Sequence, residues 1–140
     1  MRLWKGIIIH HSLTKDSDTV SWGAIKDYHL KQGFKDIGYH FGLEYVDGKI
    51  KLMRGRSTEE DGAHTKGKNK DYIGICLVGN YDITEPTEDM YSQLAILCRE
   101  LMERNGFDMD AIHGHFNFAE KTCPGRNFNW MKFARYLMEA

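Results

Sequence analysis

The sequence predicts an α/β domain in which a central mixed β-sheet is flanked by α-helices. Short runs of β-branched and apolar residues at 6–11 and 71–81 are typical of strands that are buried on both faces. Longer segments at 21–33 and 87–106 carry apolar residues at helical spacing. The two kinds of segment alternate, and 140 residues suffice for one core but not comfortably for two, so we expect a single domain over residues 1–140.

The segment 21–33 is expected to form a helix, and the segment 39–53 a hairpin. Ser21 is suited to cap the first turn of the helix. Gly33 is suited to end it, because glycine tolerates the left-handed backbone that closes many helices. The Asp-Gly pair at 47–48 favours the positive φ angles of a tight turn, which places the turn of the hairpin there.

The second half of the chain is expected to contain a long helix, a short strand and a final helix. Thr87 is the predicted N-cap of the long helix, and the two acidic residues that follow it favour the positive end of the helix dipole. Gly106 is predicted to end this helix. A last strand is expected near 110–113, and Asn129 is expected to cap the final helix.

Composition and charge exclude several classes of protein. The 19 basic and 20 acidic side chains give a net charge of −1, which offers no electrostatic reason to bind nucleic acid or an anionic membrane surface. No stretch of eighteen apolar residues occurs, so we expect no membrane insertion. The apolar run near the start is too short for a signal peptide, which predicts a chain that is cytoplasmic on synthesis.

Three cysteines at wide spacing do not suggest a disulfide framework. Cys76 and Cys98 lie within apolar patterns and are expected to be small buried side chains. Cys123 lies in no such pattern, within the polar stretch HGHFNFAEKTCPG at 113–125. Its environment therefore needs a different explanation.

A metal site is one explanation for this polar stretch. His10 closes the first strand, and the carboxyl end of a buried strand is where ligands bind in open α/β sheets. His115 and Cys123, eight residues apart, could supply two further ligands from one loop. Two imidazoles and one thiolate leave the fourth position of a tetrahedral zinc ion open, as in catalytic sites. Spacing alone leaves a metal site, a thiol nucleophile and an ordinary polar loop all open.

The chain resembles the type 2 N-acetylmuramoyl-L-alanine amidases, a zinc amidase superfamily that includes phage lysozymes and the peptidoglycan recognition proteins. The matching segments occur in the family's order and run over most of the chain. They are IIIHHSLT at 7–14, IKDYHLKQGFKDIGYHF at 25–41, GAHTKGKNKDYIGICLVGNYD at 62–82 and HGHFNFAEKTCPG at 113–125.

The resemblance implies a monomeric enzyme that holds one Zn²⁺ per chain and acts on peptidoglycan, as a phage or prophage endolysin does. The bond cleaved would be the amide between the muramyl lactyl group and L-Ala. The implied metal ligands are His10, His115 and Cys123. Tyr39 and Lys121 match the family's catalytic groups, and His64 lies in a loop that borders the family's substrate groove, so we expect it to contact peptide or sugar.

The chemistry of amide hydrolysis suits these residue types. Bound Zn²⁺ lowers the pKa of water from about 15.7 to about 7, which makes a nucleophile available near neutral pH. Lys121 would stabilise the oxyanion, and the Tyr39 hydroxyl would orient the attacking water. The acidic residues near the motifs are expected to be solvated: Glu44, Asp71 and Glu120. The histidines next to these groups are expected to be structural or to support the ligands: His11, His40 and His113.

Three alternatives compete with a zinc amidase. A peptidoglycan-binding module without catalysis would lack the third ligand, whereas this chain keeps Cys123. Some phage members of the superfamily also inhibit an RNA polymerase, but no motif of this sequence supports or excludes such a partner. A thiol hydrolase that uses Cys123 as nucleophile would need a base held against the sulfur in place of a metal.

Overall fold

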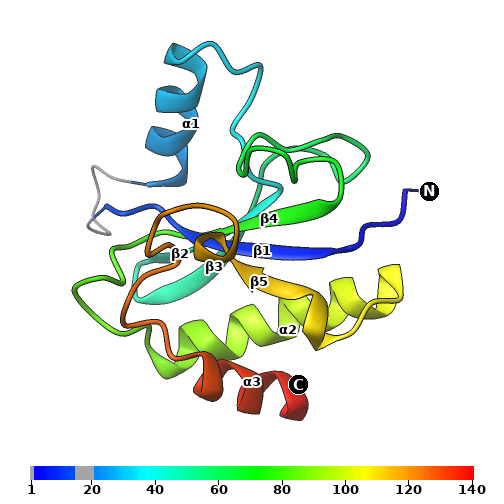
Figure 1. The fold of residues 1–140 in the computed structure, drawn as a ribbon. Coiled ribbons are helices and arrows are strands. Elements are labelled where there is room, and N and C mark those ends of the chain that lie inside the picture. The colour runs from blue at the N-terminus through cyan, green and yellow to red at the C-terminus, as the bar shows by residue number, and fades with distance from the viewer. Residues whose placement is uncertain (1, 15–20) are drawn as a thin grey trace.

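The computed structural model describes residues 2–14 and 21–140, and these residues form a mixed sheet flanked by helices, as the sequence predicts (Figure 1). Within them the sheet has five strands in the order β3-β2-β4-β1-β5. Strand β1 is parallel to both of its neighbours, β4 and β5. Strand β2 is parallel to β4, and β3 is antiparallel to β2. The strands are β1 (Gly6–His11), β2 (Phe41–Val46), β3 (Lys49–Arg54), β4 (Tyr72–Leu77) and β5 (Ile112–Gly114).

The predicted hairpin is confirmed as β2 and β3. Asp47 and Gly48 connect the two strands with φ angles of 53° and 76°. Asp and Gly tolerate this region better than most residues, so the turn fixes the register of the pair. The last strand begins later than predicted, because residues Met109–Ala111 form a 3-10 turn (η1) before β5.

The described helices lie on both sides of the sheet (Figure 1). Helix α1 (Trp22–Lys31) rises from one side, whereas α2 (Glu88–Asn105) and α3 (Trp130–Glu139) pack together on the opposite side. The predicted N-caps are confirmed, since the side chains of Ser21, Thr87 and Asn129 each accept a backbone hydrogen bond from the first turn. Gly106 ends α2 at a φ of 79°.

The apolar cores on the two faces of the sheet differ in size. The larger apolar core lies on the side of α2 and α3, and it includes Ile7 and Ile9 of β1. The core under α1 is small and consists of Trp22, Ile37, Cys76 and Val78 with a few partly buried neighbours. Since successive strand residues point to opposite faces, His10 projects to the α1 side, next to its register partner Cys76.

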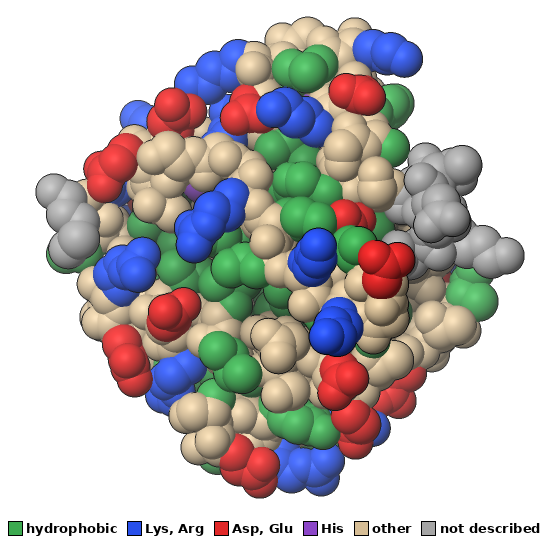
Figure 2. Space-filling model, turned by 180° about the vertical axis from the view of Figure 1, so that it is seen from behind, with side chains coloured by type: hydrophobic (Ala, Val, Ile, Leu, Met, Phe, Trp, Pro, Cys, Tyr) green, Lys and Arg blue, Asp and Glu red, His purple; other side chains and the backbone are tan. Residues whose placement is uncertain are grey.

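The face of the molecule turned away in Figure 1 carries charges of both signs. Seen from the side opposite to Figure 1, lysines and arginines lie among aspartates and glutamates, with apolar side chains between them (Figure 2). Among the described residues, no helix is both long enough and apolar enough to span a lipid bilayer.

Candidate metal centre

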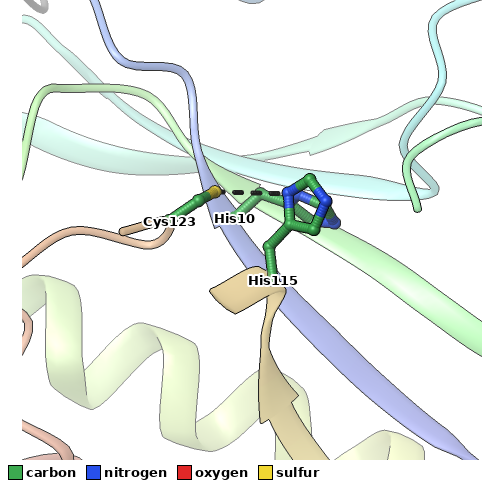
Figure 3. A group of neighbouring side chains, drawn as sticks. All are labelled: His10, His115 and Cys123. Carbon is green, nitrogen blue, oxygen red and sulfur yellow. Dashed lines mark hydrogen bonds between the residues drawn. The ribbon is translucent and has the colours of Figure 1, made fainter. Parts of the chain in front are cut away.

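Three side chains of types that can bind a metal come from distant parts of the chain and converge at one place (Figure 3). His10 comes from β1, His115 opens a 3-10 turn (η2, His115–Asn117) directly after β5, and Cys123 comes from the loop that follows. One donor atom of each lies within 4.8 Å of the others, and His10 Nδ1 is 3.8 Å from Cys123 Sγ. Two nitrogens and one sulfur at these separations can hold a tetrahedral ion with its fourth position open.

The loop that carries Cys123 is held in place by Asp82, a residue that sequence reasoning did not single out. The carboxylate accepts hydrogen bonds from the Thr122 hydroxyl and from the Arg126 backbone N–H, both at 2.9 Å. These two bonds, on either side of Cys123, keep the pKa of Asp82 below its ordinary value. In the sequence, Asp82 ends the stretch GNYD and lies far from all three donor residues, so its role in holding the Cys123 loop could not be read from spacing.

A close backbone approach fixes the far end of the same loop. Gly125 has a φ of 122°, and a Cβ at this position would lie 2.5 Å from the carbonyl of Tyr81. The Asn127 N–H donates to that carbonyl at 2.8 Å. Only glycine fits this contact without moving the backbone, so the Pro-Gly turn sets how closely the Cys123 loop packs on the turn that follows β4.

Burial controls the protonation of the three donors. It lowers the pKa of His10 well below its ordinary value, with neighbouring histidines and Lys121 adding to the effect. Burial and then the charge of Lys121 also lower the pKa of His115. The Cys123 pKa is raised to about 12 by burial, although the His11 backbone N–H donates to Sγ at 3.3 Å. The imidazoles are therefore neutral near pH 7, as metal ligands must be.

These shifts argue against a thiol nucleophile. A cysteine hydrolase needs a thiolate beside a charged or proton-accepting imidazole, which requires a lowered thiol pKa. Here the pKa of Cys123 is raised and that of His10 is lowered. A cation bound between the donors would reverse the balance at the sulfur, because a coordinated thiol loses its proton.

The two predicted catalytic residues line the same cavity as the donors. This cavity has a volume of about 650 Å³, and its wall includes Tyr39, Lys121 and the three donor residues. The Tyr39 ring centroid lies 5.1 Å from that of His10, and Lys121 is exposed at the rim. Burial raises the pKa of Tyr39 well above its ordinary value, so its hydroxyl keeps the proton at neutral pH.

Comparison with known proteins identifies the family. A sequence profile described as N-acetylmuramoyl-L-alanine amidase matches residues 1–126. The chain belongs to this amidase family. It is 33% identical to an endolysin of Enterobacteria phage T3 over 126 aligned residues, and the alignment covers 86% of this chain and 80% of the relative. It is 32% identical over 127 residues to a peptidoglycan recognition protein of Trichoplusia ni, covering 86% and 68%.

A solved structure supports the same assignment. The N-acetylmuramoyl-L-alanine amidase LysC from Clostridium intestinale URNW superposes on this chain with a TM-score of 0.83 and 27% identity, covering 96% of this chain and 85% of that one. These comparisons confirm the family that the sequence resembles. They also confirm the predicted α/β fold and the hydrolase activity that the family implies.

His64 of the amidase is a buried residue of the cavity wall. It lines the cavity but is only 9% exposed, and both of its ring nitrogens face groups of the protein. Nδ1 is 2.9 Å from His10 Nε2, and Nε2 donates to the Tyr72 carbonyl at 3.0 Å. Burial lowers the pKa of His64 to about 3.

One expectation about the acidic residues of the amidase is wrong. Glu44 is 5% exposed rather than solvated, and it accepts a hydrogen bond of 3.0 Å from the Trp22 backbone N–H. The first turn of a helix has unpaired N–H groups and a positive dipole end, so a buried carboxylate from β2 is stabilised there. Glu120 is exposed as predicted, and Asp71 is partly exposed beside Lys5.

The remaining histidines of the amidase lie outside the donor set. The Nδ1 atoms of His11 and His40 accept the backbone N–H groups of Tyr81 and Gly74, so both rings support the fold, as predicted. His113 packs on the rings of Tyr72 and Phe118.

His29, to which the sequence assigned no role, lies on the cavity wall. Its Nδ1 accepts the Gly38 N–H at 2.9 Å. Its ring centroid is 5.6 Å from that of Tyr39. The helical spacing of α1 gave no sign of this position, because the contact with Gly38 joins the helix to the loop that follows it.

Proposed function

We propose that this amidase is a zinc-dependent peptidoglycan hydrolase of the endolysin kind. It cleaves the amide between the muramyl lactyl group and L-Ala. The observation that carries the proposal is the convergence of His10, His115 and Cys123 within 4.8 Å on the wall of one cavity. The relatives support the substrate, since they are an endolysin and a peptidoglycan recognition protein.

The donor chemistry fits zinc. Zn²⁺ prefers imidazole nitrogen and thiolate sulfur, and three protein ligands are typical of its catalytic sites. His10, His115 and Cys123 would hold one ion per chain. When bound, the ion would lower the pKa of a water molecule and polarise the carbonyl of the scissile amide.

The chain's own residues would complete the reaction. Tyr39 carries a protonated hydroxyl beside His10, and it can hold the attacking water in line with the amide carbon. Lys121 brings a positive charge to the same cavity, where it would stabilise the negative charge that develops on the amide oxygen. The α1 side of the cavity would receive the muramyl peptide and exclude competing water from these groups.

All proposed ligands and catalytic groups come from one chain. We therefore also propose that residues 1–140 form one catalytic domain and that the enzyme acts as a monomer. The non-catalytic module is disfavoured because the complete donor set is present. No feature of the described residues favours an RNA polymerase partner.

Zinc content and hydrolysis measured on the same sample test the proposal. We expect one zinc per chain by elemental analysis and release of new L-Ala amino groups from purified peptidoglycan. A chelator should abolish the release, and Zn²⁺ should restore it. Activity that survives complete chelation and disappears on thiol alkylation would instead support the thiol mechanism and overturn the proposal.

A further inference from the structure

We propose that His64 is a positioning residue that fixes the tautomer of His10. By accepting a hydrogen bond from His10 Nε2, it leaves Nδ1 as the ring nitrogen of His10 that is free to bind a metal ion. The inference rests on the proposed function in one respect, namely that His10 is a metal ligand. It assigns to His64 a role other than the substrate contact that its loop suggests from sequence.

The first step is the proton of His64 itself. The Tyr72 carbonyl, 3.0 Å from Nε2, can only accept a hydrogen bond, so Nε2 carries a proton. The ring is 9% exposed, and the groups that its nitrogens face are His10, the Thr65 hydroxyl and the Tyr72 carbonyl, none of which carries a negative charge. A second proton on this buried ring would be unstabilised, so the imidazole is neutral and its Nδ1 is an acceptor.

The second step is the position of the proton on the His10 ring. His64 Nδ1 lies 2.9 Å from His10 Nε2, a distance at which two lone pairs would repel. His10 Nε2 must therefore carry the proton and donate it. The Thr65 hydroxyl, 3.4 Å from the same nitrogen, can accept from it but is not required. The lone pair of His10 is then on Nδ1, which faces Cys123 Sγ at 3.8 Å.

The third step is the rigidity of the His64 ring. Two glycines pack closely against it, since a Cβ on Gly62 or Gly74 would lie 2.6 or 2.5 Å from its Cδ2 atom. Asn69 Oδ1 accepts the backbone N–H groups of His64 and Thr65 at 2.8 and 2.9 Å. Turning the ring over would break its hydrogen bonds to His10 and Tyr72. The orientation of His10 is thus set before a metal ion arrives.

A neutral partner also differs chemically from the usual alternative. Metal-bound histidines often donate to a carboxylate, which makes the ligand more basic and reduces the positive charge of the centre. An imidazole that donates onward to the Tyr72 carbonyl orients His10 without adding negative charge. The centre would keep more of its capacity to polarise an amide carbonyl and a water molecule.

Two nearly equal-sized substitutions test the role. In His64→Gln the side-chain amide can still accept from His10 and donate to Tyr72, whereas His64→Met fills similar space and can do neither. We expect the zinc dissociation constant, measured by competition with a chromogenic chelator, to rise about 10- to 100-fold in His64→Met. The Gln variant should recover most of the affinity. Unchanged affinity in His64→Met, together with a raised KM, would overturn the proposal in favour of a substrate contact.

The tautomer can be observed directly in the metal-free wild-type protein. Long-range ¹H–¹⁵N correlation spectra should show His10 protonated at Nε2 and His64 also protonated at Nε2. A His10 ring protonated at Nδ1 would overturn the inference, even if the Met variant failed to fold. The measurement does not involve hydrolysis. A protein with the expected tautomers that binds zinc but does not cleave peptidoglycan would therefore contradict the proposed function and leave this inference standing.

Discussion

The two faces of the sheet use their buried volume in opposite ways. On the side of α2 and α3, a large cluster of aliphatic and aromatic side chains packs against alternate residues of β1 and β4. On the side of α1, the apolar cluster is small, and the neighbouring space holds His10, His64 and the Cys123 loop. The first face supplies most of the hydrophobic stabilisation, which allows the second face to bury polar groups whose desolvation is unfavourable.

The strongest test of this division is Cys123→Ser. The Ser hydroxyl is a poor zinc ligand, so we expect loss of the metal and of hydrolysis, while the far-ultraviolet circular dichroism stays unchanged because the large core is untouched. Retention of zinc would show that Cys123 is not a ligand. Loss of the fold would show that the two faces are not independent.

The opposite test is Leu94→Ala in α2. Leu94 is fully buried in the large core, so the substitution should lower the free energy of unfolding by about 2–5 kcal/mol in urea denaturation. The zinc affinity of the folded variant should stay the same, because no proposed ligand contacts this helix position. A matched control is Ile96→Ala on the same helix, where the side chain is half exposed and the loss should be much smaller.

Next in size are Tyr39→Phe and Lys121→Ala on the α1 side. Each should retain zinc and lose hydrolysis by about 10²-fold or more, the usual effect of removing one proton-handling or oxyanion-stabilising group. Tyr39→Phe is the sharper variant because it removes one hydroxyl and keeps the packing of the ring. Hydrolysis at the wild-type rate would make Tyr39 structural, and loss of zinc would mean that it helps to hold the metal.

The smallest expected effect is a dependence of stability on pH in the metal-free protein. Burial lowers the pKa of His40 and His64 below the ordinary value of 6.5, to about 3 for His64. Below pH 6.5 the unfolded chain therefore binds more protons than the folded one. The free energy of unfolding should be constant above that pH and fall as the pH drops through it, by about 1.4 kcal/mol per unit per group. Equal urea midpoints at pH 7.5 and 5.5 would contradict this.

Local sequence patterns predicted the elements of the fold well. Caps, the Asp-Gly turn and the apolar runs act over a few residues, so their physical causes are readable from the chain itself. The donor set was left open by spacing, since His10 and Cys123 are 113 residues apart and only the family resemblance joined them. The structure shows that the three side chains do converge.

The supporting residues could not be read in the same way. Asp82 acts through hydrogen bonds to residues 40 and 44 positions away, and Glu44 reaches back 22 positions to the start of α1. Each is an ordinary acidic residue in sequence and acquires its role only when tertiary packing brings unpaired donors to it. His64 shows the same limit, because its loop predicts a substrate contact, whereas close packing against Gly62 and Gly74 buries its ring.

The position of β1 has a consequence for how a bound ion would leave. This strand lies between β4 and β5 and is buried along its whole length, so its backbone amides should exchange with solvent only when the whole protein unfolds. His115 and Cys123 belong to a segment outside the regular sheet that is tied down by a few hydrogen bonds. Release of the ion would therefore begin with a local opening of that segment, and His10 would remain in place as the point to which a returning ion first binds.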